Sequence, residues 1–326
     1  MKTQLIIAIT SSTLLTVLMP LLAADTLIPQ SPVKVTGTQG KFDFIKIDTA
    51  QNRLLACHTA NGSLDVIDVA TSKLIKSIPT GAAQGVAVDD KGGRYFVSVS
   101  KPPKMVIIDS TKLEVSGEVP LTYPADVMAY AADLDRAFVC NDEKPILWII
   151  DPTAKTIVAT LNMPGQGMED LGFDDKGMYL YQCLKDSNEL AQIDAKGQKV
   201  ITSWPTAPAE NPHGMAVVPG SHAALVVGGN GKLVLMDLIS GKVLASCDVS
   251  LKVDEIAFDP GMNRVYCASG LGTISVVSLD QNRLTTLDTL PSSQGAHSIA
   301  VDPKTHTVWT AFVKDGKAYV QAFTGK

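Results

Sequence analysis

Polar residues recur at a nearly constant spacing along this chain of 326 residues, and they are the residues that could do chemistry. Successive members stand 41, 42, 43, 44, 41 and 43 residues apart, and the positions around them are mostly apolar. They are Asp43, Gln84, Asp126, Glu169, His213, Asp254 and His297. If the fold brings them together, the carboxylates and imidazoles will repel or desolvate one another unless protons, water or a cation balance them.

Such a set predicts a binding site for a small polar ligand or a divalent metal ion. Oxygen ligands suit Ca²⁺ or Mg²⁺, whereas histidines combined with carboxylates suit Zn²⁺. The candidate metal ligands are Asp43, Glu169, His213, Asp254 and His297. The alternative interpretation is that water and backbone groups satisfy these side chains and no ligand is bound.

The elements that must position these residues are short strands. Apolar segments such as FIKID (44–48), VAVDD (86–90) and IAFDP (256–260) recur seven times, each ending in a turn. Taking the last strand residue as an anchor, the polar residue always stands five positions earlier. The anchors are Asp48, Asp89, Ala131, Asp174, Val218, Asp259 and Asp302. Three further strand-like segments follow most anchors, with turn formers such as Asn61-Gly62 between them.

A repeat of this length with four antiparallel strands predicts an all-β, seven-bladed β-propeller. The first strand of each blade lines the axis of a propeller, so the seven polar residues are expected to form a ring at one mouth of the central channel. The seventh unit supplies only three strands, and we expect residues 31–37 to complete it as the outer strand. This closure removes unpaired sheet edges. Residues 25–326 are therefore predicted to form a single domain.

Further polar residues follow the second strands, which return to the same face. His58, Asn141 and Lys185 are expected to form a second shell around the ring. Cys57, Cys140 and Cys183 all stand nine residues after an anchor, where small side chains are expected to pack inside the blades. His222 and His306 fall in turns on the opposite face, where we expect them to be exposed to solvent.

Residues 1–24 have the form of a cleavable secretory signal. Lys2 precedes an apolar stretch that ends in the small residues Ala23 and Ala24. We therefore expect a periplasmic or secreted protein with no membrane span after signal removal. The formal net charge is −5 and the chain has no blocks of Lys or Arg, so the sequence does not predict a basic surface that would bind nucleic acid.

Several strand pairs resemble a known family. RLLACHTANGSLDVID (53–68), VDEIAFDPGMNRVY (253–266) and RVYCASGLGTISVVS (264–278) are similar to the YVTN-type repeats of YncE-like seven-bladed propeller proteins of the bacterial periplasm. The resemblance covers nearly all of the chain after residue 24, although no YVTN tetrapeptide is intact. It implies the fold and specifies no chemistry.

Three hypotheses for function follow. The first is an exported binding or accessory protein that uses the ring for a small polar ligand or metal, since no pair of nucleophile and base emerges from the sequence. The second is a metal-dependent hydrolase or lactonase that uses the same ring. The third is a scaffold that presents its loops to another exported protein.

Overall fold

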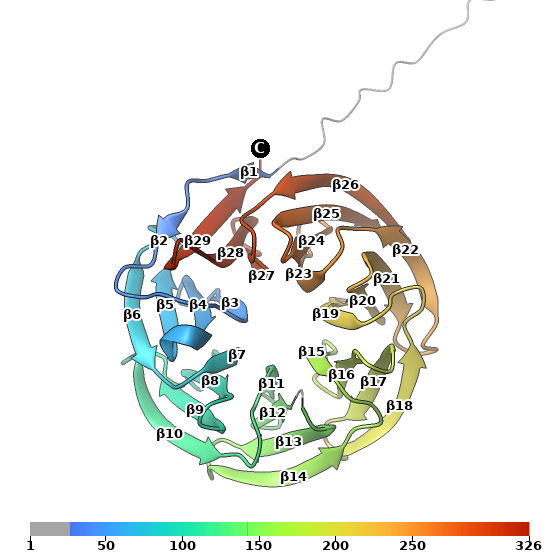
Figure 1. Cartoon of the computed structure of the whole chain (residues 1–326). Coiled ribbons are helices and arrows are strands. Elements are labelled where there is room, and N and C mark those ends of the chain that lie inside the picture. Colours follow the sequence, from blue (N-terminus) through green and yellow to red (C-terminus); the bar gives the residue numbers. More distant parts are fainter. Residues whose placement is uncertain (1–26, 142, 326) are drawn as a thin grey trace, which may run out of the picture.

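The computed structural model describes residues 27–141 and 143–325, which form seven antiparallel sheets around a central channel (Figure 1). Blade 1 consists of β3 (Ile45–Asp48), β4 (Arg53–His58), β5 (Ser63–Asp68) and β6 (Leu74–Pro79). Blade 2 consists of β7 (Ala83–Asp89), β8 (Arg94–Val99), β9 (Lys104–Asp109) and β10 (Glu114–Pro120). Blade 3 consists of β11 (Met128–Ala131), β12 (Arg136–Cys140), β13 (Ile146–Asp151) and β14 (Thr156–Asn162). The prediction of an all-β, seven-bladed propeller is confirmed.

The remaining blades continue the same order from the axis outward. Blade 4 consists of β15 (Met168–Phe173), β16 (Tyr179–Leu184), β17 (Glu189–Asp194) and β18 (Lys199–Pro205). Blade 5 consists of β19 (Pro212–Val218), β20 (Ala223–Gly228), β21 (Lys232–Asp237) and β22 (Val243–Asp248). Blade 6 consists of β23 (Val253–Asp259), β24 (Arg264–Ser269), β25 (Thr273–Asp280) and β26 (Arg283–Pro291).

Blade 7 joins the two ends of the described chain. Its strands are β27 (Ser298–Asp302), β28 (Thr307–Lys314) and β29 (Lys317–Thr324). Two short N-terminal strands, β1 (Ile28–Pro29) and β2 (Val33–Lys34), pair antiparallel with β29 and close the ring. The predicted closing strand is therefore present, but it is split into two pieces and begins earlier than residue 31. The predicted signal segment, residues 1–24, lies outside the described residues.

The recurring aspartates make the turns. Asp48 Oδ1 accepts the backbone N–H groups of Ala50 and Gln51, both at 3.0 Å. Asp259 Oδ1 accepts those of Gly261 and Met262 in the same way. The residue before the second strand adopts the left-handed conformation in equivalent turns, with φ of 53° at Asn52 and 65° at Gly93. The repeat thus reflects turn chemistry, because short polar side chains satisfy turn N–H groups and tolerate positive φ.

The core lies in the interfaces between neighbouring blades. One cluster combines Leu55 and Leu64 of blade 1 with Val86 and Tyr95 of blade 2, all buried. The thiols of Cys57, Cys140 and Cys183 are free and fully buried, as predicted for packing residues. Burial raises the pKa of the Cys183 thiol well above its usual value, so this thiol stays protonated and unreactive.

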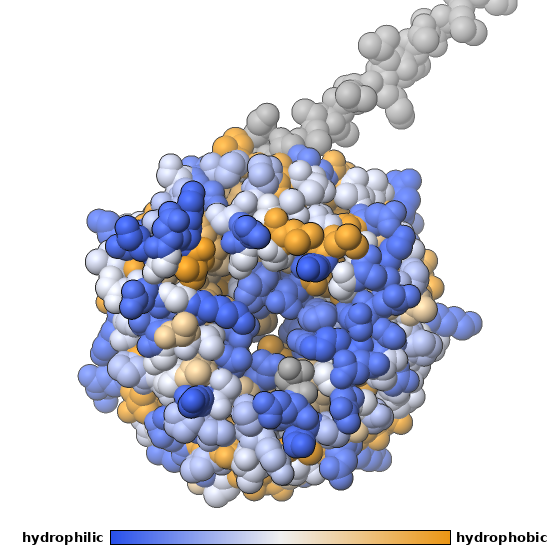
Figure 2. All heavy atoms as spheres, in the orientation of Figure 1, coloured by the Kyte–Doolittle hydropathy of each residue, from blue (hydrophilic) through white to orange (hydrophobic). Residues whose placement is uncertain are grey.

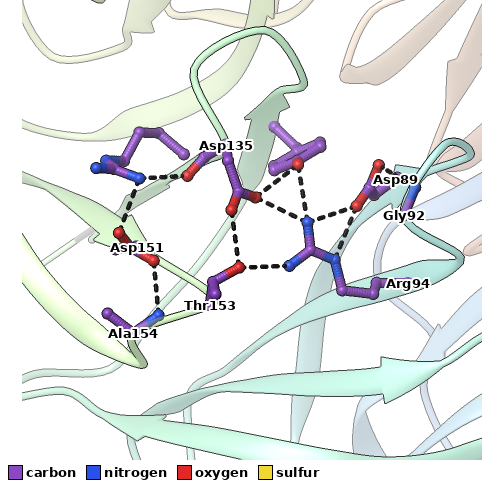
Figure 3. Close-up of polar contacts among 9 residues, drawn as sticks. Asp89, Gly92, Arg94, Asp135, Asp151, Thr153 and Ala154 are labelled. Carbon is purple, nitrogen blue, oxygen red and sulfur yellow. Dashed lines mark hydrogen bonds and ion pairs between the residues drawn. The ribbon is translucent and has the colours of Figure 1, made fainter.

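A polar network bridges blades 2 and 3 on the side of the ring where the first strands end (Figure 3). Arg94, the first residue of β8, donates to Asp89 of its own blade, with Nε 2.8 Å from Oδ2. The guanidinium also reaches Asp135 Oδ1 at 2.7 Å and Thr153 Oγ1 at 3.2 Å in blade 3. Its central carbon lies 5.2 Å from the centre of the Phe96 ring. One arginine therefore fastens two blades together.

Helix is nearly absent from the described part of the chain. The one helical segment there is a 3₁₀ turn, η1 (Thr59–Asn61). Within residues 27–141 and 143–325, no helix has the length and apolar character needed to cross a membrane.

Candidate functional site

The seven predicted ring residues stand at or just before the beginning of the innermost strands, and His213, Asp254 and His297 line a cavity at the mouth of the channel. Gln84, Glu169, His213 and Asp254 lie within the first residues of β7, β15, β19 and β23. His297 immediately precedes β27, and Asp43 and Asp126 stand two residues before β3 and β11. The structure therefore brings the predicted residues to the same end of the seven first strands.

Only part of the ring forms close clusters of groups able to bind a metal. In the described residues, one cluster contains Asp43, Glu255 and His297, and the other contains Glu169, His213 and Asp254. Within each cluster, one potential ligand atom from every residue lies within 4.8 Å of the others. Gln84 and Asp126 belong to neither cluster.

Cationic side chains already occupy much of this acidic environment. His297 Nδ1 lies 2.8 Å from Asp254 Oδ2, and His213 Nε2 lies 3.8 Å from Glu169 Oε1. The ammonium group of Lys185 forms an ion pair with Glu169. Asp254 and Glu169 thus each face nitrogen atoms of neighbouring side chains.

The pKa values of the ring residues reflect burial and this pairing. Burial raises the pKa of Asp43 to about 6, although Lys41 and His297 partly oppose the change. Burial alone would raise the pKa of Asp254, but His297 outweighs it and lowers that pKa. Burial would likewise lower the pKa of His297, and Asp254 outweighs it and raises that pKa. Asp254 and His297 thus each favour the charged form of the other.

The residue that follows each ring residue in the sequence lies where neighbouring blades meet, and Asp170 and Glu255 connect the blades there by hydrogen bonds. Asp170 Oδ2 accepts the backbone N–H of Met215 in the next blade at 3.0 Å. Glu255 Oε2 accepts the N–H of Ile299 in the same manner at 3.1 Å. At the equivalent Gly214, a Cβ atom would meet the backbone of β23 at 2.7 Å, so only glycine fits there. Burial raises the pKa of Asp170 to about 6 and that of Glu255 well above its usual value.

A cavity of about 580 Å³ opens at this mouth, over blades 4 to 7. Figure 2 shows a hollow at the centre of the ring, bordered largely by hydrophilic residues. The lining residues are Lys41, Lys185, Asn211, His213, Gly229, Lys252, Val253, Asp254, Gly270 and His297. Lys41 and Lys252 are exposed, and among the described residues neither has an ion-pair or side-chain hydrogen-bond partner. The rim of the cavity therefore has two ammonium groups without a direct partner in the described structure, although Lys41 also acts electrostatically on Asp43 and Asp254.

An apolar cavity of about 330 Å³ adjoins the first and shares Lys41 and His297 with it. Its walls include Phe42, Phe312 and Val313. The combined site offers cations at its rim and apolar contact on one side.

The predicted second shell is only partly at the cavity. Lys185 lines it, as expected. His58 is instead fully buried inside blade 1, where Nδ1 lies 2.7 Å from Asp65 Oδ2 and Nε2 lies 3.2 Å from the Gly40 carbonyl oxygen. Asn141 is also buried, and it donates to the Pro124 carbonyl oxygen and accepts the Lys144 N–H. Among the residues that line the two cavities, neither His58 nor Asn141 occurs.

The two histidines predicted to be exposed on the opposite face differ. His222 is exposed, but His306 is half-buried. Its Nδ1 atom lies 2.7 Å from the buried Asp259 Oδ2 in the neighbouring blade. The prediction for His306 was wrong because a turn residue can reach across a boundary between blades that the sequence does not show.

Sequence reasoning missed Lys41, Asn211 and Lys252. All three stand seven residues before an anchor, two before the ring residue of the same blade. The other blades have Ala82, Pro124, Gly167 and Gly295 at this position. The position seven residues before each anchor could therefore have been examined in the sequence, but only three of the seven residues there are polar.

The first half of the chain carries a family signature. The sequence model of the family described as "Cytochrome D1 heme domain" matches residues 29–218, which is more than half of the chain. The chain belongs to the cytochrome d1 haem domain family. The family is known for eight-bladed propellers, whereas this member closes its ring with seven blades. The finer resemblance to YncE-like proteins stays a prediction.

The family name implies a haem, and the channel mouth of this cytochrome d1 domain relative does not fit one. A macrocycle needs apolar contact on both faces and a histidine or similar axial ligand. In the described structure, apolar side chains flank one side only, while Lys185, Asn211 and Lys252 stand on the other. One ring nitrogen of His297 is engaged by Asp254 and one of His213 by the Asn211 carbonyl oxygen at 2.7 Å, which leaves the other nitrogen of each ring able to bind a metal. It is therefore the polar lining, and not the histidines, that does not fit a haem.

Other comparisons show a likeness in sequence over half the chain and in fold over nearly all of it. THO complex subunit 3 of Arabidopsis thaliana is 27% identical over 166 residues, 50% of this chain and 51% of that protein. The chain thus spans about half the length of the curated relative it matches. Hydrazine synthase of Kuenenia stuttgartiensis superimposes with a TM-score of 0.73 at 15% identity, covering 88% of this chain and 98% of that one. For a chain of the mitotic checkpoint complex the TM-score is 0.79 at 12% identity, with coverage of 98% and 99%. These likenesses show the propeller fold alone.

Proposed function

We propose that this protein is an exported binding propeller whose channel-mouth cavity holds a small organic anion. The observation that carries the proposal is the pair of lysines, Lys41 and Lys252, that flank the cavity and, among the described residues, have no carboxylate within ion-pair distance. Lysine is a flexible point charge that suits carboxylate or phosphate groups. Ligand binding would supply the missing negative charge.

The remaining charges at the site support an anion rather than a cation. Asp254 is balanced by His297, and Glu169 by Lys185, so these carboxylates are not free to attract a cation. The adjoining apolar cavity at Phe42 and Phe312 would hold a short apolar part of the ligand. An aromatic carboxylate combines both features.

The test is calorimetric titration of the protein with benzoate and, separately, with succinate. Lys41→Gln and Lys252→Gln should each weaken binding about tenfold, the effect of losing one charged contact. The matched control is Lys112→Gln, because that lysine of blade 2 is 72% exposed and lines neither cavity. Equal affinity in all four proteins would contradict the proposal.

A second candidate function is metal-dependent hydrolysis, for example of a lactone, and the two clusters of histidine and carboxylates favour it. The carboxylates of Asp43, Glu169 and Asp254, with His213 or His297, would hold Ca²⁺, Mg²⁺ or Zn²⁺, and the remaining histidine or a glutamate would act as general base. The Lys185 ammonium would first have to leave Glu169. Elemental analysis of protein purified without chelator decides this: a stoichiometric metal that is lost in Asp43→Ala and His213→Ala supports the hydrolase, and no metal excludes it.

The proposed location is the periplasm or the cell exterior, on the evidence of the signal-like residues 1–24. N-terminal sequencing of the protein from a cell fraction tests it, and a chain that begins at residue 24 or 25 is expected. A role as scaffold for another exported protein is the alternative to ligand binding, and co-purification of a partner that is insensitive to Lys41→Gln would favour it.

A further inference from the structure

The seam between blades 7 and 1 contains a cavity of about 710 Å³ on the face opposite the channel mouth. Its walls come from the turns that end the first and third strands and from the closing segment. The residues that matter here are Asn52, Ala70, Asp302, Thr307 and Trp309. Every one of them has an equivalent at the seam between blades 2 and 3, which makes a direct comparison possible.

At the seam between blades 2 and 3, that space is filled by the Arg94 side chain (Figure 3). Its guanidinium is bound by the Asp89 carboxylate, lies over the Phe96 ring, and reaches Asp135 and Thr153 of blade 3. The seam between blades 1 and 2 uses Arg53 similarly, which donates to the Ser110 carbonyl oxygen at 2.5 Å and to Tyr95 Oη at 3.1 Å.

Blade 7 keeps the acidic and aromatic parts of this arrangement but lacks the cation. Asp302 ends β27 as Asp89 ends β7, and Trp309 is the third residue of β28 as Phe96 is the third of β8. The first residue of β28 is Thr307, in the place of Arg94. On the blade 1 side, Asn52 and Ala70 take the places of Asp135 and Thr153.

In the part of the chain that the structure describes, Asp302 has hydrogen-bond donors but no cation, and the Trp309 indole N–H has no acceptor. Asp302 is 4% exposed and, among the described residues, forms no ion pair; its oxygens accept only the Lys304 N–H at 3.0 Å and the Thr305 hydroxyl at 2.8 Å. The Lys304 ammonium group is directed to the Thr49 carbonyl oxygen and lines no part of the cavity. The indole N–H of Trp309 is buried, also without a hydrogen-bond partner in the described structure.

We propose that this cavity is a binding site for a guanidinium group, such as the arginine side chain of a peptide. Asp302 would accept charge-assisted hydrogen bonds from the guanidinium. Trp309, which is 2% exposed, would contact the guanidinium through the small part of its ring that reaches the cavity. The site is separate from the channel mouth and does not depend on the function proposed for it.

The experiment compares two probes that differ only in charge, N-acetyl-L-arginine amide and its uncharged analogue N-acetyl-L-citrulline amide. Binding is followed by the NMR signal of the Trp309 indole N–H, which is identified by its loss in Trp309→Phe. The arginine probe should shift this signal and bind about tenfold more tightly than the citrulline probe. Agmatine, which lacks the peptide-like groups, shows by its relative affinity whether the amide parts contribute.

Two variants in the cavity and one control variant elsewhere make the result specific. Asp302→Asn should weaken arginine binding about tenfold while the turn is kept, because asparagine also caps such turns. Thr307→Arg should abolish binding and raise the unfolding temperature, since the new side chain can occupy the cavity as Arg94 does in blade 2. Asn282→Arg, in the exposed turn between β25 and β26, adds the same charge elsewhere and should leave binding unchanged. Equal binding of both probes, or full binding by Thr307→Arg, would overturn the proposal.

Discussion

At the scale of single residues, Asp43 stands out because the fold opposes its ionisation. Its pKa is raised to about 6, first by burial and then by the nearby Asp254, while Lys41 and His297 act in the opposite direction. In the unfolded chain the carboxyl ionises at its ordinary pKa of 3.8. Between these two values the folded protein binds more protons than the unfolded one, so this group causes stability to fall as pH rises from about 4 to 6.

Asp43→Asn removes this penalty and should stabilise the protein only where the carboxyl would be ionised. We expect the free energy of unfolding to increase by about 1–2 kcal/mol at pH 7.5 and to be unchanged at pH 4. Urea unfolding at the two pH values measures it. Asp280→Asn, which alters a 68% exposed carboxylate, is the matched control and should show no such difference. The same gain from Asp43→Asn at both pH values would show that ionisation is not its cause.

The sequence predicted the ring residues because a propeller places equivalent positions of each repeat at the same height along its axis. It did not predict which of them pair. The contact of His297 with Asp254 depends on the rotamers of two side chains from different blades. Glu169 likewise pairs with Lys185, which follows β16. His58 was placed near the ring by register alone, whereas its ring is fixed inside blade 1 by Asp65.

At the scale of elements, a buried ion pair at a seam between blades is expected to stabilise the protein more than an exposed ion pair. Arg94→Ala would leave Asp89, whose side chain is 3% exposed, without its cation, and would remove the contacts to blade 3. We expect a loss of about 2–4 kcal/mol, since leaving one member of a buried pair behind is costly. Arg283→Ala breaks an exposed pair with Asp280 at 3.4 Å and should cost less than about 1 kcal/mol. Chemical denaturation of both variants checks the difference, and equal losses would refute this account of the seam.

The turn aspartates and the four-strand repeat could be predicted at this scale because each depends on residues close together in sequence. Asp48, for example, caps a turn within three residues of itself. The contacts across seams could not be predicted in the same way. Arg94 reaches Asp135 and Thr153, which are 41 and 59 residues away, and Arg136 at the equivalent position of blade 3 pairs with Asp151 of its own blade instead. Equivalent positions thus share a location but not a partner.

At the scale of the whole molecule, the ring is closed by residues from its two ends, and this closure has a measurable energetic role. β1 and β2 cover the outer edge of β29, where Val33 is paired with Val320 and the Val35 N–H is bonded to the Ala318 carbonyl oxygen at 2.9 Å. Leu27 and Val35 are 5% and 2% exposed. An uncovered β29 would offer a row of unpaired backbone groups to other molecules.

A chain that begins at Thr36 should therefore be less stable than one that begins at Leu27, and more prone to associate. Losing the two buried side chains alone removes about 3–6 kcal/mol, at about 1.5–3 kcal/mol each. Urea unfolding measures the loss, and light scattering after gel filtration measures association. A synthetic peptide of residues 27–37 should restore both properties when added to the shorter chain, because it can pair with β29 in the same register. A shorter chain that stays monomeric and fully stable would mean that the six complete blades and the three-stranded seventh hold the ring without closure.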